Sequence, residues 1–110
     1  MGKFVISKRT NGDFQFNLKA NNGQIILTSQ GYSSKSSCEN GVESVRANPQ
    51  VDSRFERKIS SNEKPYFNLK SSNGQIVGSS EMYESTTSME NGIASVKTNA
   101  PEATIDDQTV

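Results

Sequence analysis

Histidine and tryptophan are absent from this chain of 110 residues, and cysteine occurs only once, as Cys38. Without histidine the chain has no Ser-His or Cys-His nucleophile pair and no imidazole metal ligand. A single cysteine forms no internal disulfide, and no apolar run reaches the length of a membrane span. These absences predict a cytoplasmic protein that is not an enzyme, binds no metal or cofactor and does not enter a membrane.

Acid–base chemistry by carboxylates is the one catalytic route that the composition leaves open. Glu39 and Glu90 hold equivalent positions in two predicted helices, and two carboxylates brought together there could exchange protons. Glutamates on helix faces are ordinarily solvated, however. Cys38 lies on the apolar stripe of the first helix, where a thiol packs as a small core residue. We therefore expect no catalytic residue.

Charge is balanced in this chain, with twelve basic and twelve acidic side chains and a formal net charge of zero at pH 7. Such a balance argues against a general binder of polyanions and disfavours nucleic acid as a partner. Residues 1–50 hold six basic and three acidic side chains, whereas residues 51–110 hold six and nine. The opposite signs favour attraction between the two halves of one folded domain.

The most informative feature of the sequence is an internal duplication, in which the second copy follows the first at an offset of 51 residues. Phe16-Asn17-Leu18-Lys19 returns as Phe67-Asn68-Leu69-Lys70, and Asn22-Gly23-Gln24-Ile25 returns as Asn73-Gly74-Gln75-Ile76. Half of this chain is too small to bury a stable core alone. We therefore expect a single domain, residues 1–110, built from two repeats at about 1–51 and 52–110, and a monomer with an internal pseudo-dimer.

Each repeat begins with a pattern typical of three antiparallel strands. In the first repeat, residues 4–9 are rich in strand-forming side chains, and Phe14, Phe16 and Leu18 alternate with polar residues. Asn11-Gly12 and Asn22-Gly23 are turn signals between these strands. The second repeat has the same pattern in residues 55–59, 66–70 and 75–77, and residues 103–105 predict one last short strand.

A short amphipathic helix follows the strands of each repeat. Cys38, Val42 and Val45 recur at helical spacing, and Met89, Ile93 and Val96 repeat the stripe. Ser34 is a candidate N-cap, and Ser36 with Glu39 is a candidate capping box. Gly41 and Gly92 lie inside these helices, where glycine is costly, so we expect a close approach of another group at each.

These residues resemble the YegP-like proteins of the DUF1508 or UPF0339 family over nearly the whole chain. The resemblance rests on the repeated segments Phe16-Asn17-Leu18-Lys19 and Asn22-Gly23-Gln24-Ile25, on Tyr32, Glu39-Asn40-Gly41-Val42 and Ser44-Val45, and on their second copies. It implies an α+β fold of tandem β-β-β-α-β units that share one antiparallel sheet, with two helices packed on one face and the C-terminal strands exchanged between repeats. It implies no particular activity.

The outward face of the sheet is the candidate binding surface. If Phe16 and Leu18 point into the core, the polar residues between them point outward, and the second copy repeats this arrangement. We predict that this polar face, or a groove between the repeats, binds a protein partner. The candidate binding residues are Asn17, Lys19, Asn68 and Lys70, with Gln24 and Gln75 at the border.

Three other interpretations remain open at this stage. Outward lysines and Tyr66 would suit weak binding of single-stranded nucleic acid. A small polar ligand could lie between the repeats. Finally, both copies could have kept their polar residues from one ancestor for solubility alone.

Overall fold

The computed structural model describes residues 2–109 and consists of seven strands and two helices in one chain. The first repeat contains β1 (Lys3–Lys8), β2 (Phe14–Lys19), β3 (Ile25–Thr28) and α1 (Lys35–Ala47). After a short 3-10 turn at Asp52–Arg54, the second repeat contains β4 (Phe55–Ile59), β5 (Pro65–Lys70), β6 (Ile76–Ser79), α2 (Thr86–Asn99) and β7 (Thr104–Asp107). The α+β class and the order of the elements are as predicted.

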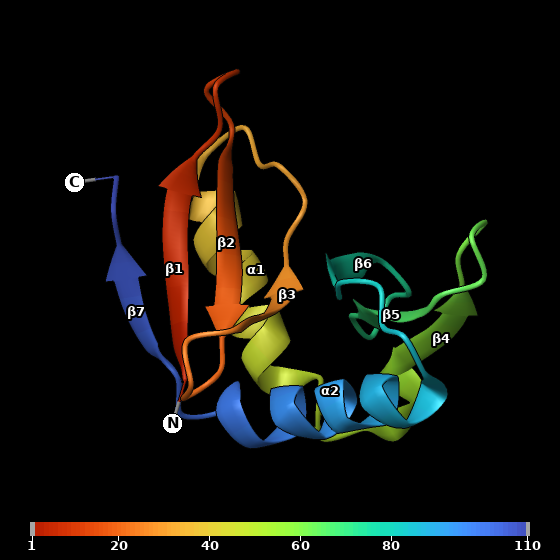
Figure 1. Ribbon diagram of the computed structural model, residues 1–110. Coiled ribbons are helices and arrows are strands. Elements are labelled where there is room, and N and C mark those ends of the chain that lie inside the picture. The colour runs from red at the N-terminus through yellow and green to blue at the C-terminus, as the bar shows by residue number, and fades with distance from the viewer. Residues whose placement is uncertain (1, 110) are drawn as a thin grey trace.

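All seven strands belong to one sheet, in the order β4-β5-β6-β3-β2-β1-β7. The repeats meet in the middle, where β3 pairs with β6 through Thr28 and Ser79. The last strand, β7, leaves the second repeat and lies beside β1 of the first (Figure 1). This is the predicted exchange, with two differences: the β1–β7 pair is parallel, and no strand in residues 2–109 covers the free edge of β4.

The two helices lie on the same face of the sheet, each across the boundary between the repeats. α1 contacts β2 of its own repeat and β6 of the other, and α2 contacts β5 and β3 in the same way. Figure 1 shows α1 running behind the strands of the first repeat and α2 running crosswise to it. The buried core therefore contains side chains from both repeats.

The inward and outward residues of the strands follow the predicted alternation. Phe16 and Leu18, and their counterparts Phe67 and Leu69, are fully buried. The register between β2 and β3 shifts after Leu18, where Ile26 of β3 is the extra, bulged residue, and the register between β5 and β6 shifts after Leu69, where Val77 of β6 is the extra residue. A bulge adds one residue to one strand and increases its local twist. Because it occurs at the same place in both repeats, it is part of the repeated structure.

The helix glycines make room for a tyrosine. A Cβ atom on Gly41 would lie 2.9 Å from Cζ of Tyr32, and one on Gly92 would lie 2.7 Å from Cζ of Tyr83. Each tyrosine ring stacks on a core phenylalanine, at centroid distances of 6.4 Å for Tyr32 on Phe16 and 6.3 Å for the second copy. The predicted close approach is therefore confirmed. Of the two candidate caps, Ser34 is the N-cap of α1 and accepts a hydrogen bond from the amide of Ser37.

The repeats differ at one buried position where they touch each other. Leu27 is fully buried, and its counterpart 51 residues later is Gly78. A Cβ atom on Gly78 would lie 2.7 Å from Cγ of Leu27, so the leucine side chain fills the space beside both positions. Two equal side chains would compete for this space, and only one large residue fits.

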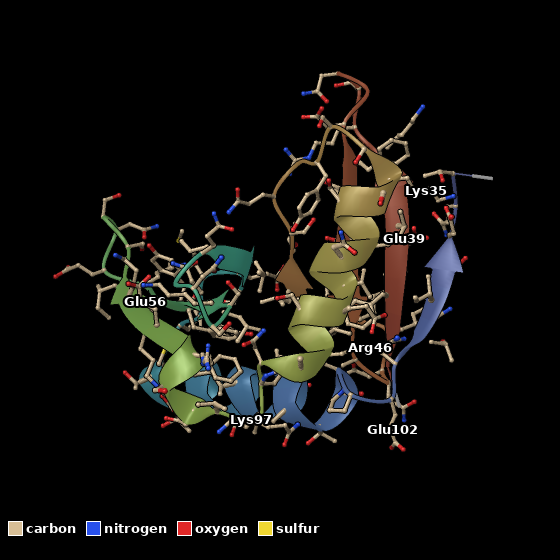
Figure 2. All side chains as sticks on the ribbon, turned by 180° about the vertical axis from the view of Figure 1, so that it is seen from behind. Lys35, Glu39, Arg46, Glu56, Lys97 and Glu102 are labelled. Carbon is tan, nitrogen blue, oxygen red and sulfur yellow. The ribbon has the colours of Figure 1, made fainter. Side chains whose placement is uncertain are left out.

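Two residues of α1 hold β7 and the residue before it beside β1. Lys35 forms an ion pair with Asp107, and Arg46 donates a hydrogen bond to the carbonyl of Ala103 while its guanidinium lies 5.6 Å from the centroid of the Phe4 ring. Figure 2 shows Lys35 and Arg46 on α1, on the side that faces β7. Hydrogen bonds from Lys35 and Thr109 lower the pKa of Asp107 to about 2.

We predict that Gly41→Ala destabilises the protein by about 1–3 kcal/mol, although alanine is the better helix former, because the added methyl overlaps the Tyr32 ring. Chemical unfolding measures the change. Adding Tyr32→Phe, which removes the hydroxyl nearest to the methyl, should recover part of the loss. Equal loss in the single and double variants would contradict this explanation.

Acid should loosen β7 through Asp107. Its pKa is lower in the folded protein than its ordinary value of 3.8, so its contribution to stability is present above that value and is lost as the pH falls toward about 2. NMR should show the amides of Thr104 and Gln108, which donate to the carbonyls of Gly2 and Ile6, losing their folded shifts over this range.

The matched comparison for this prediction is Asp107→Ala with Asp106→Ala, measured at neutral pH. Asp107→Ala should loosen β7 in the same way as acid does. The side chain of Asp106 has one hydrogen bond within residues 2–109, from Gln108 at 3.4 Å, so its replacement should leave β7 in place. If both variants kept β7 fully docked, the ion pair with Lys35 would not be what holds this strand.

Candidate interaction face

One continuous row of residues crosses the whole outer face of the sheet, opposite the helices. Each member is the register partner of the next on the neighbouring strand. We call it the outer row. From β4 to β7 its members are Glu56, Asn68, Ser79, Thr28, Asn17, Val5 and Asp106. It contains two of the predicted binding residues, one from each repeat.

In the second repeat the outer row is closed by hydrogen bonds among its own members. Asn68 donates to Glu56 at 3.1 Å and accepts from the hydroxyl of Ser79 at 2.6 Å. Lys70 adds an ion pair to Glu56 at 3.0 Å. The hydrogen bonds from Asn68 and Lys70 lower the pKa of the Glu56 carboxyl.

The exposure predicted for Asn68 is therefore wrong. Its side chain does lie on the outer face, but the residue is only 6% exposed, because Glu56 and Lys70 close over it. Lys70 is half-buried for the same reason. Both residues are bound to neighbours in the protein and have little capacity left for a ligand.

In the first repeat the corresponding polar groups stay open. Val5 takes the place of Glu56, so no carboxylate is available to Asn17 or Lys19, and neither side chain has a hydrogen bond or an ion pair within residues 2–109. Both are half-buried, as Lys70 is, so the lack of a side-chain partner and not a greater exposure distinguishes Lys19 from its second copy. The duplication has thus produced one closed and one open version of the same surface.

Lys19 also borders a cleft at the end of the first repeat. The cleft has a volume of about 620 Å³ and lies between the start of β1, the turn after β2 and the start of β7. Its lining includes Lys3, Lys19, Asn22 and Thr104. The open polar surface of the first repeat therefore continues from Asn17 into a concave region.

Gln24 and Gln75 lie on turns and not on the face itself. Both are exposed, and Gln24 accepts a 3.4 Å hydrogen bond from the side chain of Asn22. Gln75 lines a groove of about 410 Å³ between the repeats, together with Gln30 and Tyr32. Gln30 crosses between the repeats and donates to the carbonyl of Ile76 at 2.8 Å.

Glu39 and Glu90, the two carboxylates at equivalent helix positions, have different surroundings. Glu90 forms an ion pair with Arg57 at 2.6 Å, and the hydrogen bond from this arginine lowers the pKa of the Glu90 carboxyl, which keeps it ionised. Glu39 is exposed on α1 (Figure 2). Burial, together with the charges of Glu39 and Asp107, raises the pKa of the Cys38 thiol to about 11, so this cysteine is not a ready nucleophile.

Two negative findings apply to residues 2–109. No group of three or more cysteine, aspartate or glutamate side chains is placed to hold a metal ion. Neither helix is long and apolar enough to cross a membrane.

Sequence reasoning assigned no role to Glu56 and Arg57. Glu56 closes the outer row, and Arg57 joins Asp52 and Glu90 in an ion cluster at the edge of the second repeat. The available signal was the departure from the repeat, because these two charged residues replace Val5 and Ile6. That departure showed that the strand was unusual but did not show which groups the new charges would contact.

Comparison with known proteins identifies close relatives. A sequence model for the family described as "Domain of unknown function (DUF1508)" matches residues 10–56 and again residues 60–107. The chain is 52% identical to the UPF0339 protein YegP of Escherichia coli K12 and 48% identical to a UPF0339 protein of Shewanella oneidensis, in each case over 98% of both chains.

Solved structures give the same picture. The fold is similar to the solution NMR structure of the Escherichia coli protein, with a TM-score of 0.93 and 51% identity, over 97% of this chain and 92% of that one. For the NMR structure of the Shewanella oneidensis protein the TM-score is 0.91 at 48% identity, over 96% of this chain and 90% of that one.

The two asparagines of the outer row should differ in their effect on stability. Asn68→Ala leaves Glu56 and Ser79 without their shared partner in a buried position, and we expect it to cost about 1–3 kcal/mol. Asn17→Ala removes no contact of this kind and should cost less than about 0.5 kcal/mol. Urea unfolding of both variants measures the difference, and equal costs would show that the second repeat is not closed as described.

Proposed function

Because this chain belongs to the DUF1508 family and carries two copies of its domain, we propose that it is a non-enzymatic interaction module whose open outer face binds a protein partner. The binding surface consists of Asn17 and Lys19 with the neighbouring cleft, all in the first repeat. The second repeat acts as the internal dimer partner that completes the core, so the module works as a monomer in the cytoplasm.

The single observation that carries this proposal is the difference between the two copies of the outer row. Asn68 and Lys70 both bind the carboxylate of Glu56. Asn17 and Lys19 have no such partner in residues 2–109. An open amide offers both a donor and an acceptor, and a lysine offers a positive charge. Such groups on a rigid sheet are suited to oriented hydrogen bonds with another protein.

A protein is favoured over nucleic acid by the charges near this surface. Lys3 and Lys19 are accompanied by Asp106 at the end of the outer row, and the chain as a whole is neutral. Binding driven by phosphate contacts needs several uncompensated positive charges. A mixture of signs with open amide groups is more typical of a polar protein interface.

A small polar ligand is the second candidate, and one observation favours it. The groove between the repeats has a volume of about 410 Å³ and is lined by Gln30, Tyr32 and Gln75. Ligand pockets usually measure about 300–1,000 Å³. Binding there would involve the inter-repeat boundary and would leave Asn17 and Lys19 free.

Site-specific photo-crosslinking tests which surface is used. A photoreactive amino acid at position 17 should give a discrete protein adduct in cells, which mass spectrometry then identifies. The same amino acid at position 94, where Ala94 is exposed on α2, serves as the matched control and should give no such adduct. Adding the charge reversal Lys19→Glu should reduce the adduct at position 17, whereas Lys58→Glu, in the second repeat, should not.

The outcomes separate the alternatives. An adduct at position 17 that disappears on nuclease treatment would identify nucleic acid as the partner. If positions 17 and 94 gave the same adducts, the partner would not bind the outer face in preference to the helix surface, and the proposal would fail. If position 17 gave no adduct and a placement at Gln75 did, the groove between the repeats would be the binding site.

A further inference from the structure

The second repeat shows which chemical group fits its pair of outer donors, because it carries that group itself. The carboxylate of Glu56 accepts a hydrogen bond from Asn68 at 3.1 Å and forms an ion pair with Lys70 at 3.0 Å. These two contacts lower the pKa of the Glu56 carboxyl, so they favour its ionised form. The amide and the ammonium group together therefore form a site for a carboxylate.

The first repeat has the same donors in the same register but lacks the carboxylate. β1 and β2 pair in the register that β4 and β5 use. Val5 therefore lies opposite Asn17, at the position of the glutamate, and Lys19 follows two residues later. Valine is shorter than glutamate and has no side-chain acceptor. Asn17 is half-buried, whereas its counterpart, with the carboxylate in place, is only 6% exposed.

A second lysine adds positive charge beside this position. Lys3 and Lys19 are register partners on neighbouring strands, and both follow the alternation that places Val5 and Asn17 on the outer face. Side chains directly opposite each other have Cβ atoms about 4.5–5.5 Å apart, and like charges at such positions repel. Neither lysine forms an ion pair within residues 2–109. A carboxylate bound between them would relieve this repulsion.

One carboxylate of the first sheet edge lies on the same face without filling this position. Asp106 is opposite Val5 on β7, and its side chain accepts a hydrogen bond from Gln108. β7 is one strand further from Asn17 than β1 is, and neighbouring strands lie about 4.8 Å apart. The short aspartate side chain has no hydrogen bond or ion pair with Asn17 or Lys19 within residues 2–109.

We propose that Asn17 and Lys19 bind the carboxylate of an acidic side chain of the partner protein, with Lys3 supplying a second positive charge. This carboxylate takes the place over Val5 that the Glu56 carboxylate occupies in the second repeat. The inference rests on the proposed function for the source of the carboxylate, but not for the site itself. The second repeat is an internal copy of the bound state, in which the chain supplies the ligand.

NMR of the full-length, ¹⁵N-labelled protein tests the site with sodium acetate as the probe. The side-chain amide signals of Asn17 should shift saturably with acetate, compared with sodium chloride at equal ionic strength. Those of Asn68, whose site is filled by Glu56, should stay in place. Lys19→Gln should weaken the response of Asn17 by about threefold or more, and the matched control Lys58→Gln, at an exposed lysine of the second repeat, should leave it unchanged.

Two reciprocal variants test the comparison between the repeats. Val5→Glu supplies the carboxylate from within the first repeat and should abolish the acetate response of Asn17. Glu56→Val empties the position in the second repeat and should make Asn68 respond to acetate. Val5 is only 7% exposed, so the second variant keeps the comparison testable if the first does not fold.

The outcomes separate this proposal from the proposed function. The carboxylate site is wrong if acetate leaves Asn17 unshifted, if Asn68 of the unchanged protein shifts as much, or if inorganic phosphate at equal ionic strength binds more tightly. A protein adduct at position 17 that survives Val5→Glu would support the interaction module and overturn the carboxylate site. An acetate response without any protein adduct would support the carboxylate site and overturn the interaction module.

Discussion

The contact between Leu27 and Gly78 at the boundary of the repeats is the constraint on which the rest of the structure depends. Here β3 meets β6, and the two equivalent positions compete for one space in the core. Joining the strands produces a single sheet, and the single sheet allows α1 and α2 each to cover parts of both repeats. Without this junction each repeat would have too little apolar surface to remain folded.

The repeats have diverged mainly where their surroundings differ. Ile6 lies on β1 beside β7 and is buried. Its counterpart Arg57 lies at the open edge of the sheet and binds Asp52 and Glu90. Val5 and Glu56 differ in the same way on the outer face. As a result, the second repeat has a closed outer surface and an open sheet edge at β4. The first repeat has an open outer surface, and β7 fills its sheet edge.

Much of the fold was predictable because local rules were sufficient for it. Alternation placed Phe16 and Leu18 in the core, helical spacing placed Cys38 and Val42 there, and a mid-helix glycine indicated the close approach at Gly41. Exchange of β7 was implied only by the family resemblance. Its parallel direction had no local signal, because it depends on a partner strand about 100 positions away.

The candidate site was predicted less well. Alternation placed Asn68 on the outer face correctly, yet it did not predict burial, which follows from contacts with Glu56, Lys70 and Ser79 on three strands. Likewise, Glu63 adopts a positive φ of 65° where the first repeat uses Gly12, because both repeats close this turn with the same pair of backbone hydrogen bonds. Cross-strand neighbours decide such features, and one sequence alone does not identify them.

The position of β7 also has a consequence for the order in which the protein folds during its synthesis. β1 precedes the other six strands of this domain in the sequence and β7 follows them, so the edge of β1 stays unpaired until β7 has been synthesised. Nascent chains with such edges are vulnerable to pairing with other chains. The charged residues at the end of β1, Lys8 and Arg9, are therefore well placed to protect the growing chain during this interval.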